Sequence, residues 1–333
     1  MEAASLNIPL DFLRRAGLAR SDESPAIEAL GGGVSSDIWR VDLAGGPVCV
    51  KRALPRLRVA QKWEAPVARN RYEHRWLQRA AQAAPGAAPE VLAHDDRAGL
   101  FAMRYLEPRE HPVWKDQLRR GHADADFAAC VGATLATVHA ATSSAAFAAL
   151  FPTDEIFYAI RLEPYLVATA IKHADLALNL HSLVEKTART KLTVVHGDVS
   201  PKNILAGPRG PVFLDAECAW FGDPAFDLAF CLNHLLLKCL CVPQATARFL
   251  SCFDALAGSY LSGVAWENPS ALEARAAALL PGLLLARVDG KSPVEYLTQE
   301  AEKQKVRDFA RGLVAHPSAA LFAIRKAWQR SLM

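Results

Sequence analysis

The chain of 333 residues is long enough to bury a large hydrophobic core, either as one large unit or as two lobes. Because 51% of its residues are hydrophobic and 22% are charged, its composition is typical of a globular protein. Its formal net charge of +3 is small and dispersed, and its N-terminus lacks a cationic-then-apolar layout. We therefore expect no nucleic-acid partner, no membrane and no signal peptide.

Residues 27–53 predict three strands joined by two glycine-rich turns. The first turn spans residues 31–37, and glycines there would let backbone N–H groups approach phosphates, while serines would add hydroxyl donors. The candidate phosphate ligands in this turn are Gly32, Gly33, Ser35 and Ser36. A hairpin turn that binds no ligand is the alternative. The third strand, 47–51, ends in Lys51.

Residues 69–79 predict a helix with three large apolar side chains on one face. Glu73 lies at the edge of that face and can point inward, so it is our candidate partner for the ammonium group of Lys51. Glu64 is the alternative partner. The remaining alternative is that Glu73 forms a surface pair with a nearby Arg on the same helix.

Two further strands are predicted at 91–94 and 100–106, after which the chain becomes mostly helical. The predicted helices span residues 126–142, parts of 154–190, 227–240 and 254–284. Another helix is predicted to begin at Ser292, because Ser-Pro-Val-Glu is typical of a capping box. His139 is expected to pack in the core. We therefore predict a β-rich N-lobe, 1–105, and a helical C-lobe, 106–333.

The apolar runs at 226–242 and 279–286 are interrupted by polar residues or by Pro-Gly, so we expect buried helices there and not membrane spans. All seven cysteines lie in apolar sequence surroundings, their number is odd and no Cys-x-x-Cys occurs. These features favour packed core thiols and a reducing cytoplasm. The spacing of His234, Cys239 and Cys241 is wrong for a zinc site.

Residues 193–217 carry the most informative pattern of the chain. A β-branched strand at 193–195 precedes His-Gly-Asp-Val-Ser-Pro-Lys-Asn, which places Asn203 five residues after Asp198. A turn rich in Gly and Pro between two short apolar strands then predicts a hairpin. This hairpin would bring Asp215 back beside Asn203.

These residue types suit phosphoryl transfer from ATP. One carboxylate orients the attacking hydroxyl group and accepts its proton, while an amide oxygen and a second carboxylate hold Mg²⁺ against the phosphates. The spacing from Asp198 to Asn203 equals that of the protein-kinase catalytic loop, although Gly197 stands where protein kinases have Arg. The alternative is that Asp198 only caps a turn and that Asp215 only ends a strand.

Three segments resemble the aminoglycoside phosphotransferase and choline kinase family, which includes methylthioribose-kinase-like members. They are His196–Asn203, Asp215–Glu217 and Phe221–Leu228, and the resemblance extends from about residue 25 to the C-terminus. It implies a bilobal, protein-kinase-like α+β fold with a small β-rich N-lobe and a larger, mostly helical C-lobe. It also implies ATP and Mg²⁺ as cofactors and a small-molecule hydroxyl group as the acceptor.

The resemblance further implies roles for individual residues. Asp198 would be the catalytic base, and Asp227 would brace the catalytic loop through backbone N–H groups. The Mg²⁺ ligands would be Asn203, Asp215 and Glu217. Lys51 would hold the α- and β-phosphates, a solvated lysine being the alternative. The segment 103–107 would be the hinge between the lobes, whose backbone meets the adenine.

The implied activity is that of a small-molecule kinase acting on a sugar-like or amino-alcohol-like metabolite; no oligomeric state is implied. The Asp-x-Glu sequence at 215–217 replaces the Asp-Phe-Gly of protein kinases and argues against a protein substrate. Asn203 departs from methylthioribose kinases, which tend to lack an Asn at this position. A nucleotide-binding regulatory pseudokinase and an aminoglycoside-inactivating kinase are the alternatives.

Charge near the C-terminus bears on the acceptor. From residue 255 onward, basic residues outnumber acidic ones, and the segment 287–292 contains two cations. Because polycationic ligands call for carboxylates, this pattern predicts a neutral or anionic acceptor and argues against a polycationic aminoglycoside. A solvated turn at 287–292 is the alternative. Carboxylates could still come from the segment 141–190, namely from Asp154, Glu155 and Glu163.

Overall fold

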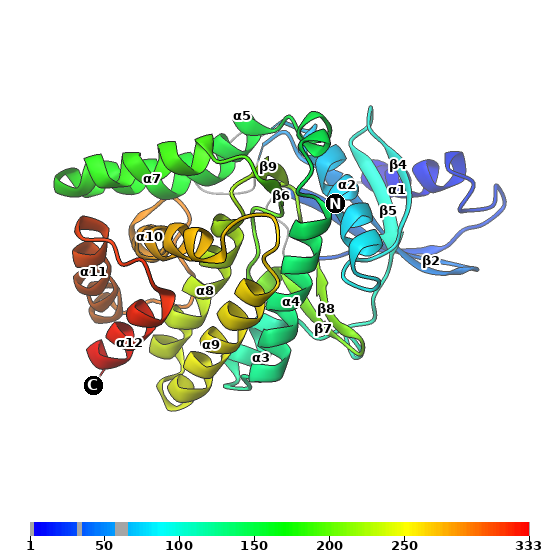
Figure 1. The fold of residues 1–333 in the computed structure, drawn as a ribbon. Coiled ribbons are helices and arrows are strands. Elements are labelled where there is room, and N and C mark those ends of the chain that lie inside the picture. Colours follow the sequence, from blue (N-terminus) through cyan, green and yellow to red (C-terminus); the bar gives the residue numbers. More distant parts are fainter. Residues whose placement is uncertain (1–2, 32–34, 57–65, 333) are drawn as a thin grey trace.

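The computed structural model describes residues 3–31, 35–56 and 66–332. It has an N-terminal region built on a five-stranded sheet and a C-terminal region that is mostly helical (Figure 1). The N-terminal region contains α1 (Ala3–Arg15), β1 (Ala26–Ala29), β2 (Ser36–Leu43), β3 (Gly46–Ala53), α2 (Arg69–Ala83), β4 (Val91–Asp95) and β5 (Leu100–Arg104). This arrangement confirms the predicted α+β fold class.

The strands of the sheet are antiparallel and follow the order β1-β2-β3-β5-β4, so β3 lies at its centre. Side chains alternate along β3. Val48 and Val50 pack with Phe12 and other apolar residues against α1, an element that the sequence pattern did not predict. Lys51 faces the opposite side, where it lines the space between the two regions.

Helix α2 covers the other face of the sheet. Its Trp76 and Leu77 are fully buried and belong to the main core, together with Phe101 of β5. Figure 1 shows α1 and α2 on opposite sides of the strands. The sheet is therefore a layer between two helices, and α2 is the element that connects it to the C-terminal region.

The C-terminal region surrounds the main hydrophobic core. Its α-helices are α3 (Trp114–Arg119), α4 (Ala125–Ala141), α5 (Asp154–Phe157), α6 (Ala168–Lys172), α7 (Ala177–Arg189), α8 (Pro224–Cys241), α9 (Thr246–Ser262), α10 (Pro269–Asp289), α11 (Glu300–Ala315) and α12 (Leu321–Ser331). A π-helix, η2 (Tyr158–Val167), joins α5 to α6, and short 3₁₀ turns are η1 (Ala145–Leu150), η3 (Ala174–Leu176), η4 (Pro201–Asn203) and η5 (Pro243–Ala245). Two short antiparallel pairs, β6 (Thr193–Val195) with β9 (Trp220–Gly222) and β7 (Ile204–Gly207) with β8 (Gly210–Phe213), carry the predicted catalytic segment.

Helix α8 is the central element of this core. By length and composition it could cross a membrane, but nearly all of its residues are buried against the other helices. Asp223 caps it by accepting a hydrogen bond from Ala225 N at 3.0 Å, and Pro224 occupies its first turn. The prediction of a buried helix at 226–242 is confirmed.

Most cysteines are buried, as predicted for thiols packed in the core. Cys130 is exposed and Cys241 is half-buried, so that prediction was wrong for these two.

Helix α11 begins at Glu300, so the prediction of a helix start at Ser292 was wrong. The carbonyl and hydroxyl oxygens of Ser292 accept hydrogen bonds from Arg287 Nη1, at 2.5 and 3.2 Å, so this serine is engaged by α10 and does not cap a helix. The capping box forms instead between Gln299 and Glu302. The segment between α10 and α11 is thus an irregular loop held against α10.

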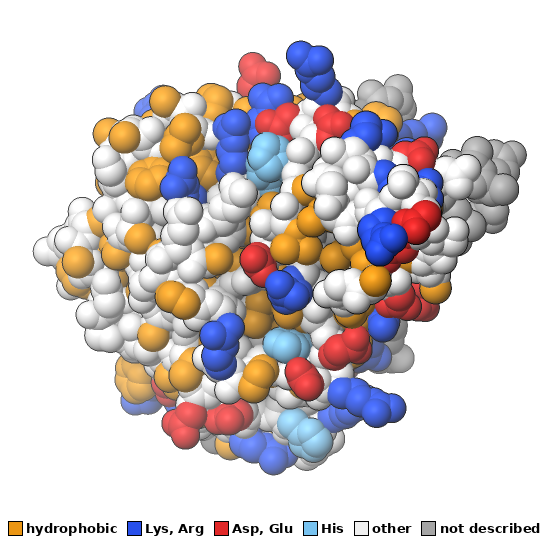
Figure 2. Space-filling view, turned by 90° about the vertical axis from the view of Figure 1, so that its right-hand side faces the viewer, with side chains coloured by type: hydrophobic (Ala, Val, Ile, Leu, Met, Phe, Trp, Pro, Cys, Tyr) orange, Lys and Arg blue, Asp and Glu red, His pale blue; other side chains and the backbone are white. Residues whose placement is uncertain are grey.

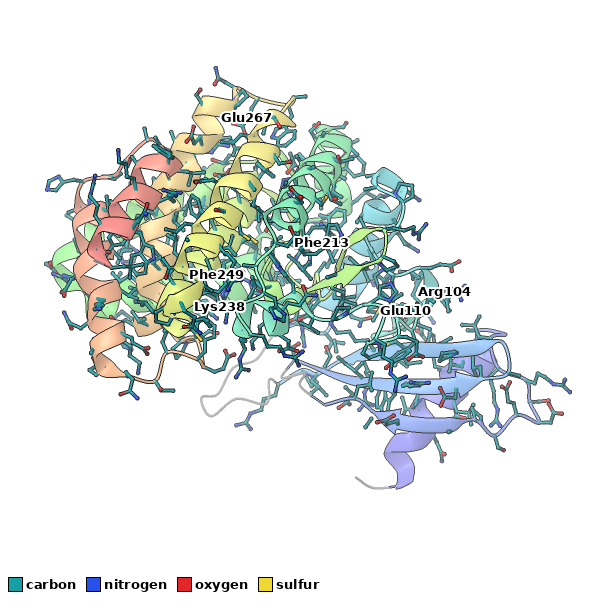
Figure 3. The ribbon with its side chains drawn as sticks, turned by 90° about the horizontal axis from the view of Figure 1, so that it is seen from below. Arg104, Glu110, Phe213, Lys238, Phe249 and Glu267 are labelled. Atoms are coloured by element: carbon teal, nitrogen blue, oxygen red, sulfur yellow. The ribbon has the colours of Figure 1, made fainter. Side chains whose placement is uncertain are left out.

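Charge is dispersed over the sheet side of the molecule. Figure 2 shows basic and acidic side chains interspersed on this face. Figure 3 shows Arg104 and Glu110 between the sheet and the helices, where the chain passes from the N-terminal to the C-terminal region. The predicted hinge at 103–107 lies at this junction.

Candidate active site

A cleft of about 590 Å³ lies between the sheet and the helical region. Strand β3, helix α2 and the hinge line one side of it, and the segments around β7 and β8 line the other. Its apolar lining residues include Leu30, Ile38, Cys49, Met103, Leu205 and Leu214. An apolar slot of this kind can accept a flat heteroaromatic ring.

The predicted partner of Lys51 is Glu73. The Nζ atom of Lys51 lies 2.7 Å from Glu73 Oε1, and both side chains are buried. The same Nζ atom also contacts Asp215 Oδ1, which comes from the C-terminal region. Burial opposes the charged form of Lys51, but the charges of Asp215 and Glu73 outweigh it and raise its pKa. Lys51 is therefore a fixed cation that links the two regions; the alternative partner Glu64 lies outside the described residues.

Asp215 has an unusual backbone conformation. It follows β8 with φ of +65°, and it is the one non-glycine residue of the described chain with a positive φ. Asp is among the few residue types that tolerate this region, which still costs roughly 1–2 kcal/mol. Burial raises the pKa of its carboxyl group, but Lys51 and Lys202 outweigh that effect and lower it. The strained turn at the strand end thus presents an ionised carboxylate to the cleft.

The backbone at Gly197 explains why the predicted catalytic loop has glycine where protein kinases have Arg. Its φ is +77°, and a Cβ atom at this position would lie 2.6 Å from the carbonyl oxygen of Cys218. Only glycine fits both conditions.

Asp227 fixes the loop by accepting hydrogen bonds from the N–H groups of His196 and Gly197 at 2.7 and 2.8 Å. These bonds confirm that Asp227 braces the loop. His139, also buried, contacts Asp227 at 3.2 Å, which confirms its packing role.

His196 ties the catalytic loop to the end of β8. Its Nδ1 accepts a hydrogen bond from Asp198 N at 3.1 Å, so its Nε2 is the protonated nitrogen that donates to Leu214 O at 3.0 Å. Burial lowers the pKa of His196 and so favours this neutral form. The ring thereby couples the positions of the loop carrying Asp198 and the strand leading to Asp215.

Asp198 is buried and held by three donors. Its Oδ2 lies 2.9 Å from Arg161 Nη2, 3.2 Å from Lys202 Nζ and 2.9 Å from Asn203 Nδ2. Burial raises the pKa of Asp198, but the charges of Arg161 and Lys202 outweigh it and hold the pKa below its ordinary value. The carboxylate is therefore ionised at neutral pH and fixed in orientation, which suits a group that aligns a hydroxyl.

Three side chains keep an oxygen available for a divalent cation. Asn203 uses its Nδ2 for both contacts with Asp198, so its amide oxygen is left over. Asp215 meets Lys51 through Oδ1 only, and Glu217 meets Arg69 through Oε2 only, among the contacts of the described residues. Carboxylate and amide oxygens are the ligands that Mg²⁺ and Ca²⁺ prefer. The donor set therefore fits the predicted metal.

Arg69 is a site residue that the sequence pattern missed. It is fully buried at the start of α2, four residues before Glu73, and its Nε donates to Glu217 Oε2 at 2.9 Å. Its Nη2 donates to the carbonyl oxygens of Ser35 and Leu54 at 2.6 and 2.8 Å. Arg69 thus holds a predicted metal ligand, the glycine-rich turn and the end of β3 together. The i,i+4 spacing from Glu73 was its only sequence signal.

The side of the cleft that we predict to bind the phosphates of a nucleotide lies partly outside the described residues. Ser35 and Ser36 are buried and line the cleft, and the hydroxyl oxygen of Ser36 has no hydrogen-bond partner among the described residues. A buried hydroxyl group without a partner is costly unless a ligand or water satisfies it. Gly32 and Gly33 lie outside the described residues.

A second group of potential metal ligands lies away from the cleft. His74, His94 and Asp96 place one ligand atom each within 4.8 Å of one another. Arg71 Nε already contacts Asp96 Oδ2 at 2.8 Å, and His74 Nε2 hydrogen bonds to Asp96 Oδ1 at 2.9 Å. These contacts satisfy the carboxylate within the protein.

The fold is that of the protein-kinase-like small-molecule kinases. A solved amicoumacin kinase, in complex with AMP-PNP and Ca²⁺, superposes with a TM-score of 0.59 at 13% identity and covers 98% of this chain and 99% of its own. A choline/ethanolamine kinase family protein from Mesorhizobium loti superposes with a TM-score of 0.53 at 16% identity. The superposition covers 97% of this chain and 98% of that protein. At these identities the likeness establishes the fold.

Sequence comparison establishes the family. The family described as "Phosphotransferase enzyme family" matches residues 26–239, and the chain belongs to it. Methylthioribose kinase 1 from Oryza sativa subsp. japonica is 24% identical over 254 residues, 67% of this chain and 58% of that protein. Methylthioribose kinase from Escherichia coli is 25% identical over 244 residues, which cover 63% of this chain and 57% of that protein. The chain thus spans less than two thirds of the length of these curated relatives, and the resemblance predicted from the catalytic segment is confirmed.

Proposed function

We propose that this protein is an ATP- and divalent-metal-dependent kinase that phosphorylates a hydroxyl group of a small molecule. The observation that carries the proposal is the convergence of Lys51, Asp215 and Asp198 on one cleft, with Lys51 contacting both Glu73 and Asp215. In this proposal residues 1–105 are the nucleotide-binding lobe, and residues 106–333 are the catalytic and acceptor-binding lobe.

The nucleotide would lie between the sheet and β7–β8. Its adenine would fill the apolar slot at the hinge, and its phosphates would extend toward Lys51, Ser35 and Ser36. Gly32 and Gly33 remain predicted phosphate contacts. Support comes from family membership and from the relative whose structure contains AMP-PNP and Ca²⁺. A divalent cation held by Asn203, Asp215 and Glu217, Mg²⁺ in our proposal, would neutralise charge on the phosphate oxygens.

Asp198 would act on the acceptor. A new bond forms between the acceptor oxygen and the γ-phosphorus, the bond from that phosphorus to the ADP oxygen breaks, and the hydroxyl proton passes to Asp198 Oδ1, because three donors already contact Oδ2. Because the pKa of Asp198 is held low, its main contribution is to align the hydroxyl group, and proton transfer comes late. Lys51, which Glu73 holds in position, would keep the nucleotide in place.

A two-part experiment tests the proposal. Calorimetric titration with ATP, with and without Mg²⁺, measures nucleotide binding, and a coupled ADP-release assay over a panel of hydroxylated small molecules measures transfer. We expect metal-dependent binding and acceptor-dependent ADP release. Binding without any transfer, together with an effect on a partner protein, would instead support the regulatory pseudokinase. Absence of ATP binding would contradict the proposal altogether.

A further inference from the structure

The acceptor end of the cleft has a distinctive wall. It is lined by Arg161, Tyr165, Lys202 and Ser292 together with the apolar side chain of Ile160, and its two charged members are both basic. Arg161 and Tyr165 lie on the π-helix η2, Lys202 on the catalytic loop, and Ser292 on the loop after α10. Residues from three separate segments therefore face the position that the acceptor must occupy.

Carboxylates that could have bound a cationic acceptor are directed elsewhere. Glu163 pairs with Lys291 at 2.6 Å, and Asp154 pairs with Lys191 and accepts from Trp220 Nε1. Glu155 is exposed. None of these three acids lines the cleft. The acidic groups that do line it are Glu73, which pairs with Lys51, and the three carboxylates of the predicted catalytic and metal sites, Asp198, Asp215 and Glu217.

Arg161 has donors to spare. It is buried, and it donates from Nε to Gly197 O at 2.5 Å, from Nη1 to Ile160 O at 2.5 Å and from Nη2 to Asp198 Oδ2. A guanidinium group carries five N–H donors and no acceptor. Among the described residues, three of these donors have acceptors, so one N–H on each of Nη1 and Nη2 is left over. Arg161 can therefore hold Asp198 and bind a ligand oxygen together.

Arg287 turns two hydroxyl groups into donors. Its Nη1 donates to Tyr165 Oη at 3.1 Å and to Ser292 Oγ at 3.2 Å. Because a guanidinium group cannot accept a hydrogen bond, each hydroxyl oxygen acts as the acceptor in these contacts, and neither hydroxyl hydrogen has an acceptor among the described residues. Tyr165 and Ser292 both line the cleft, so both O–H groups are available to it. Arg287 itself lies behind them, and its guanidinium carbon is 5.6 Å from the Tyr165 ring centroid.

The wall is thus made of donors: two N–H groups of Arg161, the ammonium group of Lys202 and two hydroxyl groups. Such an array matches an oxygen group that only accepts hydrogen bonds and carries negative charge. We propose that the acceptor is a hydroxylated compound with an anionic oxygen group, a carboxylate or a phosphate, that binds Arg161, Tyr165 and Ser292. This inference rests on the proposed kinase function and specifies the chemical class of its substrate.

Matched acceptors test this charge preference. Each set shares a hydroxylated skeleton and differs in charge: gluconate, glucose, glucosamine and glucose 6-phosphate form one set, and glycerate, glycerol, 2-amino-1,3-propanediol and glycerol 3-phosphate form another. Kanamycin serves as a polycationic comparison. Acceptor-dependent ADP release gives kcat/KM, and binding of AMP-PNP with Mg²⁺ is measured on the same protein. We expect an anionic member to exceed its neutral partner by about 10-fold or more, the equivalent of one charge-assisted hydrogen bond. The carboxylate and phosphate members show which anion is used.

Variants locate the effect within the wall. Tyr165→Phe removes one donor and keeps the ring, so KM for the anionic acceptor should rise about 10-fold or more, and the neutral acceptor should change little. Tyr158→Phe is the matched control, because Tyr158 begins the same π-helix with 44% of its surface exposed. We expect no change of acceptor preference in this control.

The outcomes separate the inference from the proposed function. If AMP-PNP does not bind, the proposed function fails and the inference fails with it. If the nucleotide binds and neutral or cationic acceptors, including kanamycin, are preferred, only the inference is overturned. The inference is also overturned if the nucleotide binds but no anionic acceptor of either set stimulates ADP release. If the protein prefers anionic acceptors and Tyr165→Phe does not change that preference, the anion does not bind to this wall.

Discussion

Replacing Asp198 by Asn tests the centre of the proposed mechanism. The amide has nearly the shape of the carboxylate and can still accept a hydrogen bond from Asn203, but it has no charge and cannot take up a proton. Loss of an aligned general base lowers rates by about 10²–10⁴. We expect kcat to fall by that factor and affinity for MgATP to stay within a few-fold, because Asp198 is not among the proposed nucleotide contacts.

The substitution also has a cost in stability. Asp198 is buried against Arg161, and removing one partner of a buried ion pair typically costs about 3–5 kcal/mol. The actual cost should be smaller, because the Asn oxygen still accepts one bond and the side chain of Lys202 is 51% exposed. A lower melting temperature must therefore be separated from a lower rate.

Asp289→Asn provides the matched control for this effect. Asp289 is also buried and ion-paired, with Arg307 Nε at 2.9 Å and His173 Nε2 at 2.8 Å, but it does not line the cleft. Kinetics of ADP release, calorimetric binding of MgATP and thermal melting are compared for the two variants at a temperature at which both are folded. The reasoning is refuted if Asp198→Asn keeps more than about a tenth of wild-type turnover, or if Asp289→Asn loses as much.

Three further predictions follow from the site and its supports. Asp215→Ala should weaken MgATP binding more than Glu217→Ala, because Asp215 also contacts Lys51; equal or reversed losses in calorimetry would mean that the proposed ligands are misassigned. Gly197→Ala should destabilise the protein by at least about 1–2 kcal/mol, since alanine must adopt φ near +77° close to a carbonyl oxygen, and an unchanged melting temperature would contradict this. Burial lowers the pKa of His196 and His234, so at these two positions the unfolded chain binds more protons and their contribution to stability should fall as pH drops below about 6.5; burial of Glu73, which raises its pKa to about 7, acts in the opposite sense. Melting curves of the wild type and of His234→Gln between about pH 7.5 and 5.5 isolate the contribution of His234, and the variant should lose less stability on acidification than the wild type.

The parts of the site that the sequence predicted are those that local chain geometry brings together. Asp198 and Asn203 are five residues apart in one loop, and a four-residue strand on either side of a tight turn returns the chain to Asp215. The distances between these residues are set by the local chain and do not depend on how the rest of the molecule is arranged. The pairing of Lys51 with Glu73 required more, namely the resemblance to kinases, because the two residues lie 22 positions apart on different elements, β3 and α2.

The missed residues act through contacts that no local pattern encodes. Arg69 joins segments centred near Ser35 and Glu217, and 148 residues separate it from the latter. Arg161 is one of many arginines in the sequence, and only the packing of the π-helix against the catalytic loop singles it out. The prediction for Ser292 was wrong for a related reason. Its local sequence is typical of a helix cap, but in the structure its hydroxyl oxygen accepts a hydrogen bond from Arg287.

Arg161 also connects recognition of the acceptor to the reaction itself. The guanidinium group that offers free donors to the acceptor is the group that keeps the pKa of Asp198 low and fixes its carboxylate. A base with a low pKa contributes little driving force for proton removal, so the rate must depend on how well the hydroxyl group is aligned with the phosphorus. An anionic group bound to Arg161 would provide that alignment, because it would fix the acceptor within one side chain of Asp198. Neutral acceptors lacking this anchor should then lose turnover as well as affinity, since poor alignment lowers kcat and lost contacts raise KM.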